Sequence, residues 1–143
     1  MIRMPRILAA TALAVAALGS TAAIAAPSPD SRPDRLAEKG EAKLAEKLAG
    51  RVAGEPVSCI FAPRSNQLDV IEHVGIVYDA GGTIYVARPQ NPRSLGRSDA
   101  LIIDRMGSQL CRQDVTRTFD RYSGFQGVVF LDNFVPYTRA GEE

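Results

Sequence analysis

The first apolar pattern along the chain is that of an amphipathic helix. In DRLAEKGEAKLAEKLAGRVAG, four apolar residues recur on one side of a 3.6-residue helix: Leu36, Leu44, Leu48 and Val52. Gly50 or Gly54 can end this helix, so the pattern predicts one amphipathic helix over residues 34–54. Gly40 costs the helix about 1 kcal/mol relative to alanine. We therefore expect Glu41–Leu48 to be its firm part.

The second pattern is the alternation that is typical of strands, and it is clearest in HVGIVYDAGGTIYVARP. Val74, Ile76 and Tyr78 alternate before the turn sequence DAGG, and Ile84 and Val86 alternate after it. A glycine-bearing turn between two alternating runs predicts a β-hairpin.

Short apolar runs separated by Gly, Pro, Asn and Asp predict more strands across residues 55–139. The runs are Val57–Phe61, Ala100–Asp104, Val115–Tyr122, Gly127–Leu131 and Phe134–Tyr137. Strands at this spacing are typical of a small antiparallel barrel or sandwich. The predicted fold class is therefore mainly β, one small domain preceded by one amphipathic helix, with residues 140–143 as a tail.

The N-terminal residues have the three parts of a secretory signal peptide. Arg3 and Arg6 give a positive start, Ile7–Leu18 is apolar, and Ala23 and Ala25 suit a signal peptidase. The apolar run is shorter than the ~20 residues that cross a bilayer. We expect a signal peptide over residues 1–25, a disordered arm over the proline-rich residues 26–33, and a periplasmic or secreted protein without a membrane span once the signal is removed.

Charge and composition argue against several classes of function. The whole chain has a net charge of +1; without residues 1–25, 15 basic residues face 16 acidic ones. A nearly neutral domain has no overall field that would hold nucleic acid, so no nucleic-acid partner is expected. No G-x-x-x-x-G-K-[ST] or G-x-G-x-x-G motif occurs, so nothing indicates a nucleotide, and no cofactor is expected.

The chain has two cysteines, Cys59 and Cys111, and one histidine, His73. In an oxidising compartment two cysteines usually form a disulfide, and this is the pairing we expect. A metal site is disfavoured because zinc usually takes four ligands and no C-x-x-C or H-x-x-x-H spacing is present. A redox-active thiol would need a nearby resolving cysteine, which is missing. Free thiols and redox chemistry remain the alternatives.

The strongest candidate for a binding surface is RPQNPRSLGR, residues 88–97, which we call the arginine loop. It contains Arg88, Arg93 and Arg97 and no acid. Arginine makes bidentate bonds to phosphate and carboxylate, and long polar loops between strands commonly carry function. From Pro56 onward, however, nine arginines face ten acids, often as neighbours, which favours salt bridges over anion recognition for the region as a whole.

The segments GRVAGEPVSCI, GTIYVARP, GSQLCRQD and FVPY resemble a family of small secreted alphaproteobacterial proteins, the sphingomonad group in particular. The resemblance covers about residues 44–139. It implies an exported bacterial protein in which Cys59 and Cys111 pair, and it implies no activity for any residue.

These observations predict an exported envelope protein that acts as a binding or accessory module without catalysis. Its partner would be another envelope protein or an exported ligand. The alternative is a small periplasmic hydrolase that uses carboxylates and His73, although His73 is more typical of a structural or exposed position. A purely structural envelope protein is the third possibility.

Overall fold

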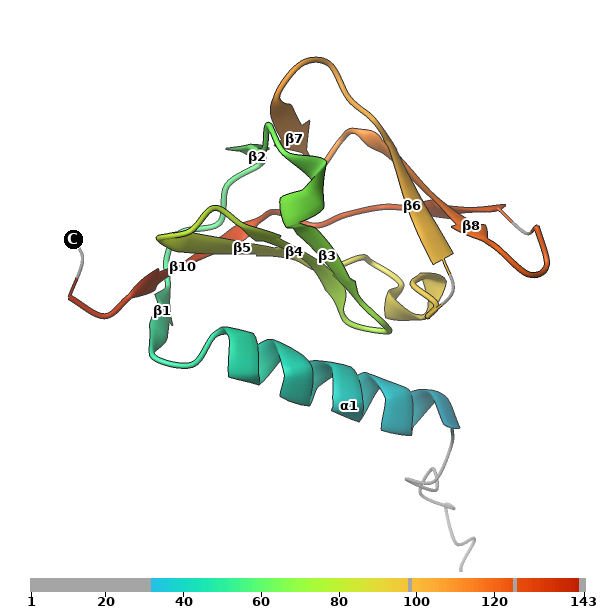
Figure 1. The fold of residues 1–143 in the computed structure, drawn as a ribbon, viewed down its shortest axis with the longest axis horizontal. Helices are drawn as coiled ribbons and strands as arrows, with labels where there is room; N and C mark the ends of the chain where they lie inside the picture. The colour runs from blue at the N-terminus through green and yellow to red at the C-terminus, as the bar shows by residue number, and fades with distance from the viewer. Residues whose placement is uncertain (1–31, 98, 125, 142–143) are drawn as a thin grey trace, which may run out of the picture.

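The computed structural model describes residues 32–97, 99–124 and 126–141. The predicted signal peptide, most of the predicted arm and the last two residues of the predicted tail lie outside these ranges. The described part contains one α-helix, two 3-10 helices of three residues each (Ser65–Gln67 and Pro92–Ser94) and ten short strands, so the prediction of a mainly β fold with one α-helix is confirmed (Figure 1).

The helix, α1, runs from Arg32 to Lys47, which differs from the predicted 34–54 at both ends. The chain leaves the helical path at Gly50, whose φ of 71° lies in the left-handed region that glycine adopts without strain. The last residues of the predicted helix instead form strand β1, Arg51–Ala53, which pairs with the C-terminal strand. Sheet pairing has overridden the helical period there, and residues 34–54 are not one helix.

The other strands follow in chain order. They are β2 (Cys59–Phe61), β3 (Leu68–Ile71), β4 (Gly75–Asp79), β5 (Thr83–Ala87), β6 (Asp99–Asp104), β7 (Gln109–Cys111), β8 (Val115–Asp120), β9 (Gln126–Val129) and β10 (Val135–Arg139). They make a five-stranded sheet in the order β1-β10-β5-β4-β3, a three-stranded sheet β6-β8-β9 and a pair β2-β7. Every pairing among them is antiparallel.

The predicted hairpin is β4–β5, and its turn explains why two glycines stand there. The N–H of Ala80 donates to the carbonyl of Thr83 at 3.0 Å, so Gly81 and Gly82 form a two-residue turn. Gly81 has a φ of 90°, which suits the turn types that match the twist of a hairpin. Asp79 accepts a hydrogen bond from the Gly81 N–H at 2.8 Å and supports the turn.

The five-stranded sheet is buried on both faces, so the molecule has two apolar cores. On one face Val77 packs with Leu44 of α1, and on the other Ile76 and Tyr78 pack with residues of the smaller sheets. Figure 1 shows α1 running beneath the large sheet, with β2, β7, β6 and β8 on the opposite side. The hairpin alternation therefore sorts side chains between two cores, not between a core and solvent.

The helix meets the sheet through its smallest residue. Gly40 is buried, and a Cβ atom added there would lie 2.6 Å from both the Glu72 carbonyl oxygen and a methyl carbon of Val74. One turn further on, Leu44 is 3% exposed and packs against Ile71. Gly40 thus allows close approach of the helix to the β3–β4 turn and does not mark a weak point.

The sheets are not closed into a barrel, so of the two architectures predicted the barrel is wrong. Strand β3 ends the five-stranded sheet and β6 ends the three-stranded sheet. In the described part of the chain no strand pairs with the outer side of either one. An open seam therefore runs between β3 and β6.

Candidate functional site

The predicted disulfide between Cys59 and Cys111 is confirmed. The two cysteines face each other across strands β2 and β7, with their sulfur atoms 2.04 Å apart. Backbone hydrogen bonds lie on both sides of the bridge, from Arg112 to the Ser58 carbonyl and from Ala62 to the Ser108 carbonyl. The bridge joins two three-residue strands that would be marginal alone.

The arginine loop does not present three free cations. Each arginine lies beside an acid from another part of the chain: Arg88 by Glu41, Arg93 by Asp34 at 3.9 Å, and Arg97 by Glu72 at 3.3 Å. Two of these acids belong to α1, so the loop is paired with the helix. The structure therefore places the predicted binding residues where their charges are already compensated.

The strongest of these pairs joins Arg88 to Glu41: both terminal guanidinium nitrogens of Arg88 donate to the two carboxylate oxygens. The hydrogen bond from Arg88 lowers the pKa of Glu41 below its ordinary value of 4.5, and partial burial offsets only part of this effect. The same hydrogen bond raises the pKa of Arg88. The pair thus contributes stability only while Glu41 is ionised.

We expect a double-mutant cycle of Arg88→Ala and Glu41→Ala to give a coupling of about 0.5 kcal/mol at pH 7, because both side chains are about half exposed. The folded-state pKa of Glu41 is depressed. The coupling is therefore fully present above pH 4.5 and is lost as the pH falls through the lower folded-state value. Urea unfolding of the four proteins at several pH values measures this. A coupling that grows on acidification contradicts it.

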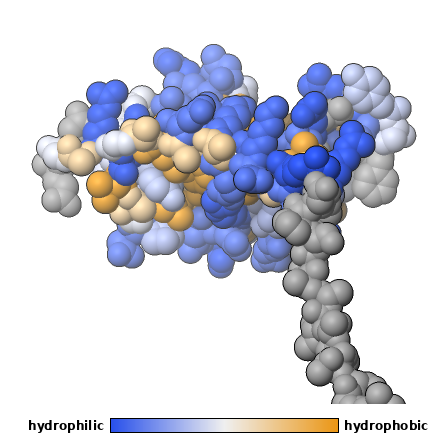
Figure 2. Space-filling view, turned by 90° about the horizontal axis from the view of Figure 1, so that it is seen from below, coloured by the Kyte–Doolittle hydropathy of each residue, from blue (hydrophilic) through white to orange (hydrophobic). Residues whose placement is uncertain are grey.

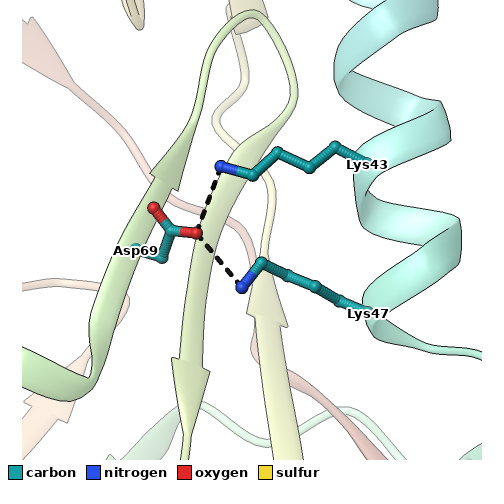
Figure 3. A network of polar contacts seen from close by, with 3 residues as sticks. All are labelled: Lys43, Lys47 and Asp69. Atoms are coloured by element: carbon teal, nitrogen blue, oxygen red, sulfur yellow. Dashed lines mark hydrogen bonds and ion pairs between the residues drawn. The ribbon is translucent and has the colours of Figure 1, made fainter.

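Two lysines fix the other side of the helix. Lys43 and Lys47 lie one helical turn apart, and both amino groups contact the same oxygen of Asp69 on β3 at 3.3 Å (Figure 3). Together with Glu41 and Arg88, these pairs join the C-terminal half of α1 to the sheet.

His73 lies in the turn between β3 and β4, two residues before β4 begins at Gly75. Its φ is 58°, a left-handed conformation that histidine adopts more readily than most residues. A hollow of about 430 Å³ brings it near Glu41, Arg88 and Arg93. No serine, threonine or tyrosine lies among the described residues that line this hollow, so it contains no nucleophilic hydroxyl for a hydrolase.

A cleft of about 550 Å³ lies in the open seam between the sheets. We call it the seam cleft. Its apolar wall comes from both sheets and from β7: Ala62, Leu68, Val70, Tyr78, Ala100, Leu101, Ile103 and Leu110. Its polar residues are Ser65, Asp99 and three arginines, Arg64, Arg105 and Arg121. A cavity of this size that combines an apolar wall with a few polar and charged groups is a candidate ligand site.

Two of the three arginines are available for a ligand. Arg105 donates a hydrogen bond to the Ala62 carbonyl, whereas Arg64 and Arg121 are exposed and have no ion pair with an acid in the described ranges. Arg121 follows Asp120, whose carboxylate accepts the N–H groups of Ser123 and Tyr122 at 2.8 Å. These hydrogen bonds lower the pKa of Asp120, so it stays ionised and fixes the turn that carries Arg121.

Sequence reasoning missed the seam cleft. Its three arginines are spread over residues 64–121, and its wall includes β3, whose short run Leu68–Ile71 was not predicted as a strand. A weak signal was present: Leu68 and Val70 alternate with Asp69 and Ile71, as in a strand that separates two environments.

The side of the molecule that α1 covers is mostly hydrophilic, with apolar side chains gathered on the half near β1 (Figure 2). Within the described ranges, no helix combines the length and the apolar character that crossing a bilayer requires.

No protein-family model matches the chain, and no curated protein or solved structure is significantly similar to it.

Proposed function

We propose that this protein is an exported, non-catalytic binding module that takes a ligand with an apolar body and a negative charge into the seam cleft. The observation that carries this proposal is the meeting of an apolar wall from two sheets with Arg64 and Arg121, which lack acidic partners among the described residues.

Size and chemistry support this choice. A cleft of about 550 Å³ lies within the range that small ligands and short peptide segments fill. Contact between an apolar ligand and the aliphatic part of the wall would contribute roughly 25 cal/mol to the free energy of binding for each Å² of apolar surface removed from water. Arginine at the edge favours carboxylate or phosphate through charge-assisted hydrogen bonds, while the single carboxylate of Asp99 is bonded to the Gly96 N–H at 2.8 Å.

The seam cleft is a better candidate than the arginine loop. An incoming anion would have to displace Glu41 from Arg88 and Glu72 from Arg97, whereas Arg64 and Arg121 require no such exchange. The loop is better explained as part of the contact between α1 and the sheet.

Export is part of the same proposal and rests on two features of the chain. The first is the signal-peptide pattern of residues 1–25, and the second is the Cys59–Cys111 disulfide, a bond that persists in the periplasm or outside the cell. The partner would then be an exported ligand or another envelope protein.

Decanoate is a suitable probe because it combines an apolar chain with one carboxylate. We expect it to bind the oxidised protein, and we expect Arg64→Ser combined with Arg121→Ser to weaken binding at least tenfold through loss of the charge-assisted bonds. Isothermal titration calorimetry measures the affinity.

The matched control is Arg112→Ser combined with Arg139→Ser, which removes two exposed arginines that do not line the seam cleft. This control should bind decanoate as the parent protein does. Equal loss in both double variants, or no binding to the parent protein, would contradict the proposed site.

A further inference from the structure

The outer edge of β3 presents backbone groups that are free to pair. Along a strand, the backbone N–H and C=O groups of successive residues point alternately toward the two neighbouring strands. The hydrogen bond from Ala80 to Thr83 shows that the backbone groups of Ala80 point toward β5, so those of Val77, three residues earlier, point toward β3. Asp69, opposite Val77, therefore bonds to β4, and its neighbour Val70 directs its N–H and C=O away from the sheet. Among the described residues, no hydrogen bond engages either group of Val70.

Open space lies on both sides of this edge. Val70 lines the seam cleft and also a second hollow of about 360 Å³ between α1 and β3, which we call the helix-side hollow. Asp99 lines both as well, so the two cavities meet at the edge of β3. A ligand at this edge would thus reach a cavity on each face of the sheet, as the alternating side chains of a strand do.

The two cavities differ in character. The seam cleft combines a wall of mostly aliphatic side chains with a few polar and charged groups, whereas charged side chains dominate the helix-side hollow, which contains Lys39, Lys43 and Arg97 together with Asp69 and Glu72. In the helix-side hollow Lys43 contacts Asp69 and Arg97 contacts Glu72.

Lys39 has no acidic partner in the described part of the chain, and it is the third such cation beside this edge, after Arg64 and Arg121. The edge is therefore complementary to a segment that is apolar on one face and acidic on the other.

We propose that the ligand of the seam cleft is an extended acidic peptide segment of a partner protein, which adds to β3 as a sixth strand of the large sheet. This inference rests on the proposed function and narrows it to one ligand class. Main-chain hydrogen bonds to Val70 supply affinity, and apolar side chains enter the seam cleft. Alternate acidic side chains face Lys39 in the helix-side hollow, and the carboxylate at the end of the segment reaches Arg64 and Arg121 in the seam cleft. The open seam between β3 and β6 is then a place for a strand that another chain supplies.

The probe is a fluorescein-labelled, acetylated heptapeptide in which glutamate and valine alternate. We expect it to bind the oxidised protein, and we expect Val70→Pro to weaken binding at least tenfold relative to Val70→Ala. Both variants lose the valine side chain, but only proline removes the outward N–H. Proline is compatible with an edge strand at such a position, and circular dichroism verifies that both variants are folded.

Two N-methylated probes test the same bond on the unaltered protein, so the result does not depend on the folding of Val70→Pro. One carries N-methyl groups on the valines and the other on the glutamates. Because N–H groups alternate in direction along a strand, one of these peptides, and only one, should lose binding. Fluorescence anisotropy gives all the affinities.

The outcomes separate this inference from the proposed function. Equal binding of both methylated peptides, or of Val70→Pro and Val70→Ala, overturns strand addition. Binding of decanoate without binding of the heptapeptide also overturns it and leaves the seam cleft as a site for a small amphipathic anion. Failure of both probes to bind overturns both proposals.

Discussion

Replacing Gly40 by alanine should lower the free energy of unfolding by about 3 kcal/mol, although alanine is the better helix former by about 1 kcal/mol. The new Cβ would lie 2.6 Å from the Glu72 carbonyl oxygen and 2.6 Å from a methyl carbon of Val74. The oxygen belongs to the backbone of the β3–β4 turn, so relief requires the helix and the sheet to separate. That movement would also disturb Leu44, the buried contact one turn away.

The control is Ala42→Gly, an exposed position in the same helix, where the loss should be only the propensity difference of about 1 kcal/mol. Urea unfolding followed by circular dichroism measures both variants. If Gly40→Ala leaves the protein as stable as before or more stable, α1 does not dock through Gly40, and the packing of the helix on the sheet is wrong.

Replacing both Cys59 and Cys111 by alanine should destabilise the protein by about 2–4 kcal/mol. The two residues are 52 positions apart, and the chain-entropy account gives about 4 kcal/mol for closing a loop of that length, an upper figure in practice. The bridge also holds the short strands β2 and β7, whose Ile60 and Leu110 belong to the core on the seam side of the large sheet.

Urea unfolding of the oxidised protein and the double variant measures this difference, with Ser58→Ala as the control beside the bridge. The intact mass of protein expressed with its leader and alkylated without reduction gives a second reading. Two unmodified cysteines and a mass that corresponds to residues 26–143 are expected. Two alkylated cysteines would contradict both the bridge and the proposed export.

The β4–β5 strands could be predicted because the alternation of their side chains along the sequence matches the two faces on which these side chains are buried. Ile76, Tyr78 and Ile84 alternate with side chains of the opposite face, and two glycines mark the turn, so the β4–β5 hairpin could be located from sequence. Strands β1, β3 and β7 were missed because each has only three or four residues, which is too short for an alternating pattern to stand out from its surroundings. Partners elsewhere in the sheets decide that these segments are strands.

The candidate site could not be predicted from sequence, because its residues are far apart along the chain and only the fold brings them together. The arginine loop looked free of acids because its partners Asp34, Glu41 and Glu72 come from α1 and the β3–β4 turn. The seam cleft requires both the strand order of the sheets and the absence of a pairing between β3 and β6 in the described residues, neither of which a local pattern encodes. The cysteines were an exception, because two residues allow only one intramolecular pair.

The position of β10 determines when this protein can fold. The last strand of the chain lies between β1 and β5, and it is an interior strand of the large sheet. In a chain that lacks β10, strand β1 therefore has no partner in the sheet, and β5 has no neighbour on its outer side. Such long-range pairing raises the contact order and slows folding. The large sheet cannot be completed until Val135–Arg139 has been made. If the protein is exported as proposed, this delay favours translocation, which requires a chain that has not yet folded.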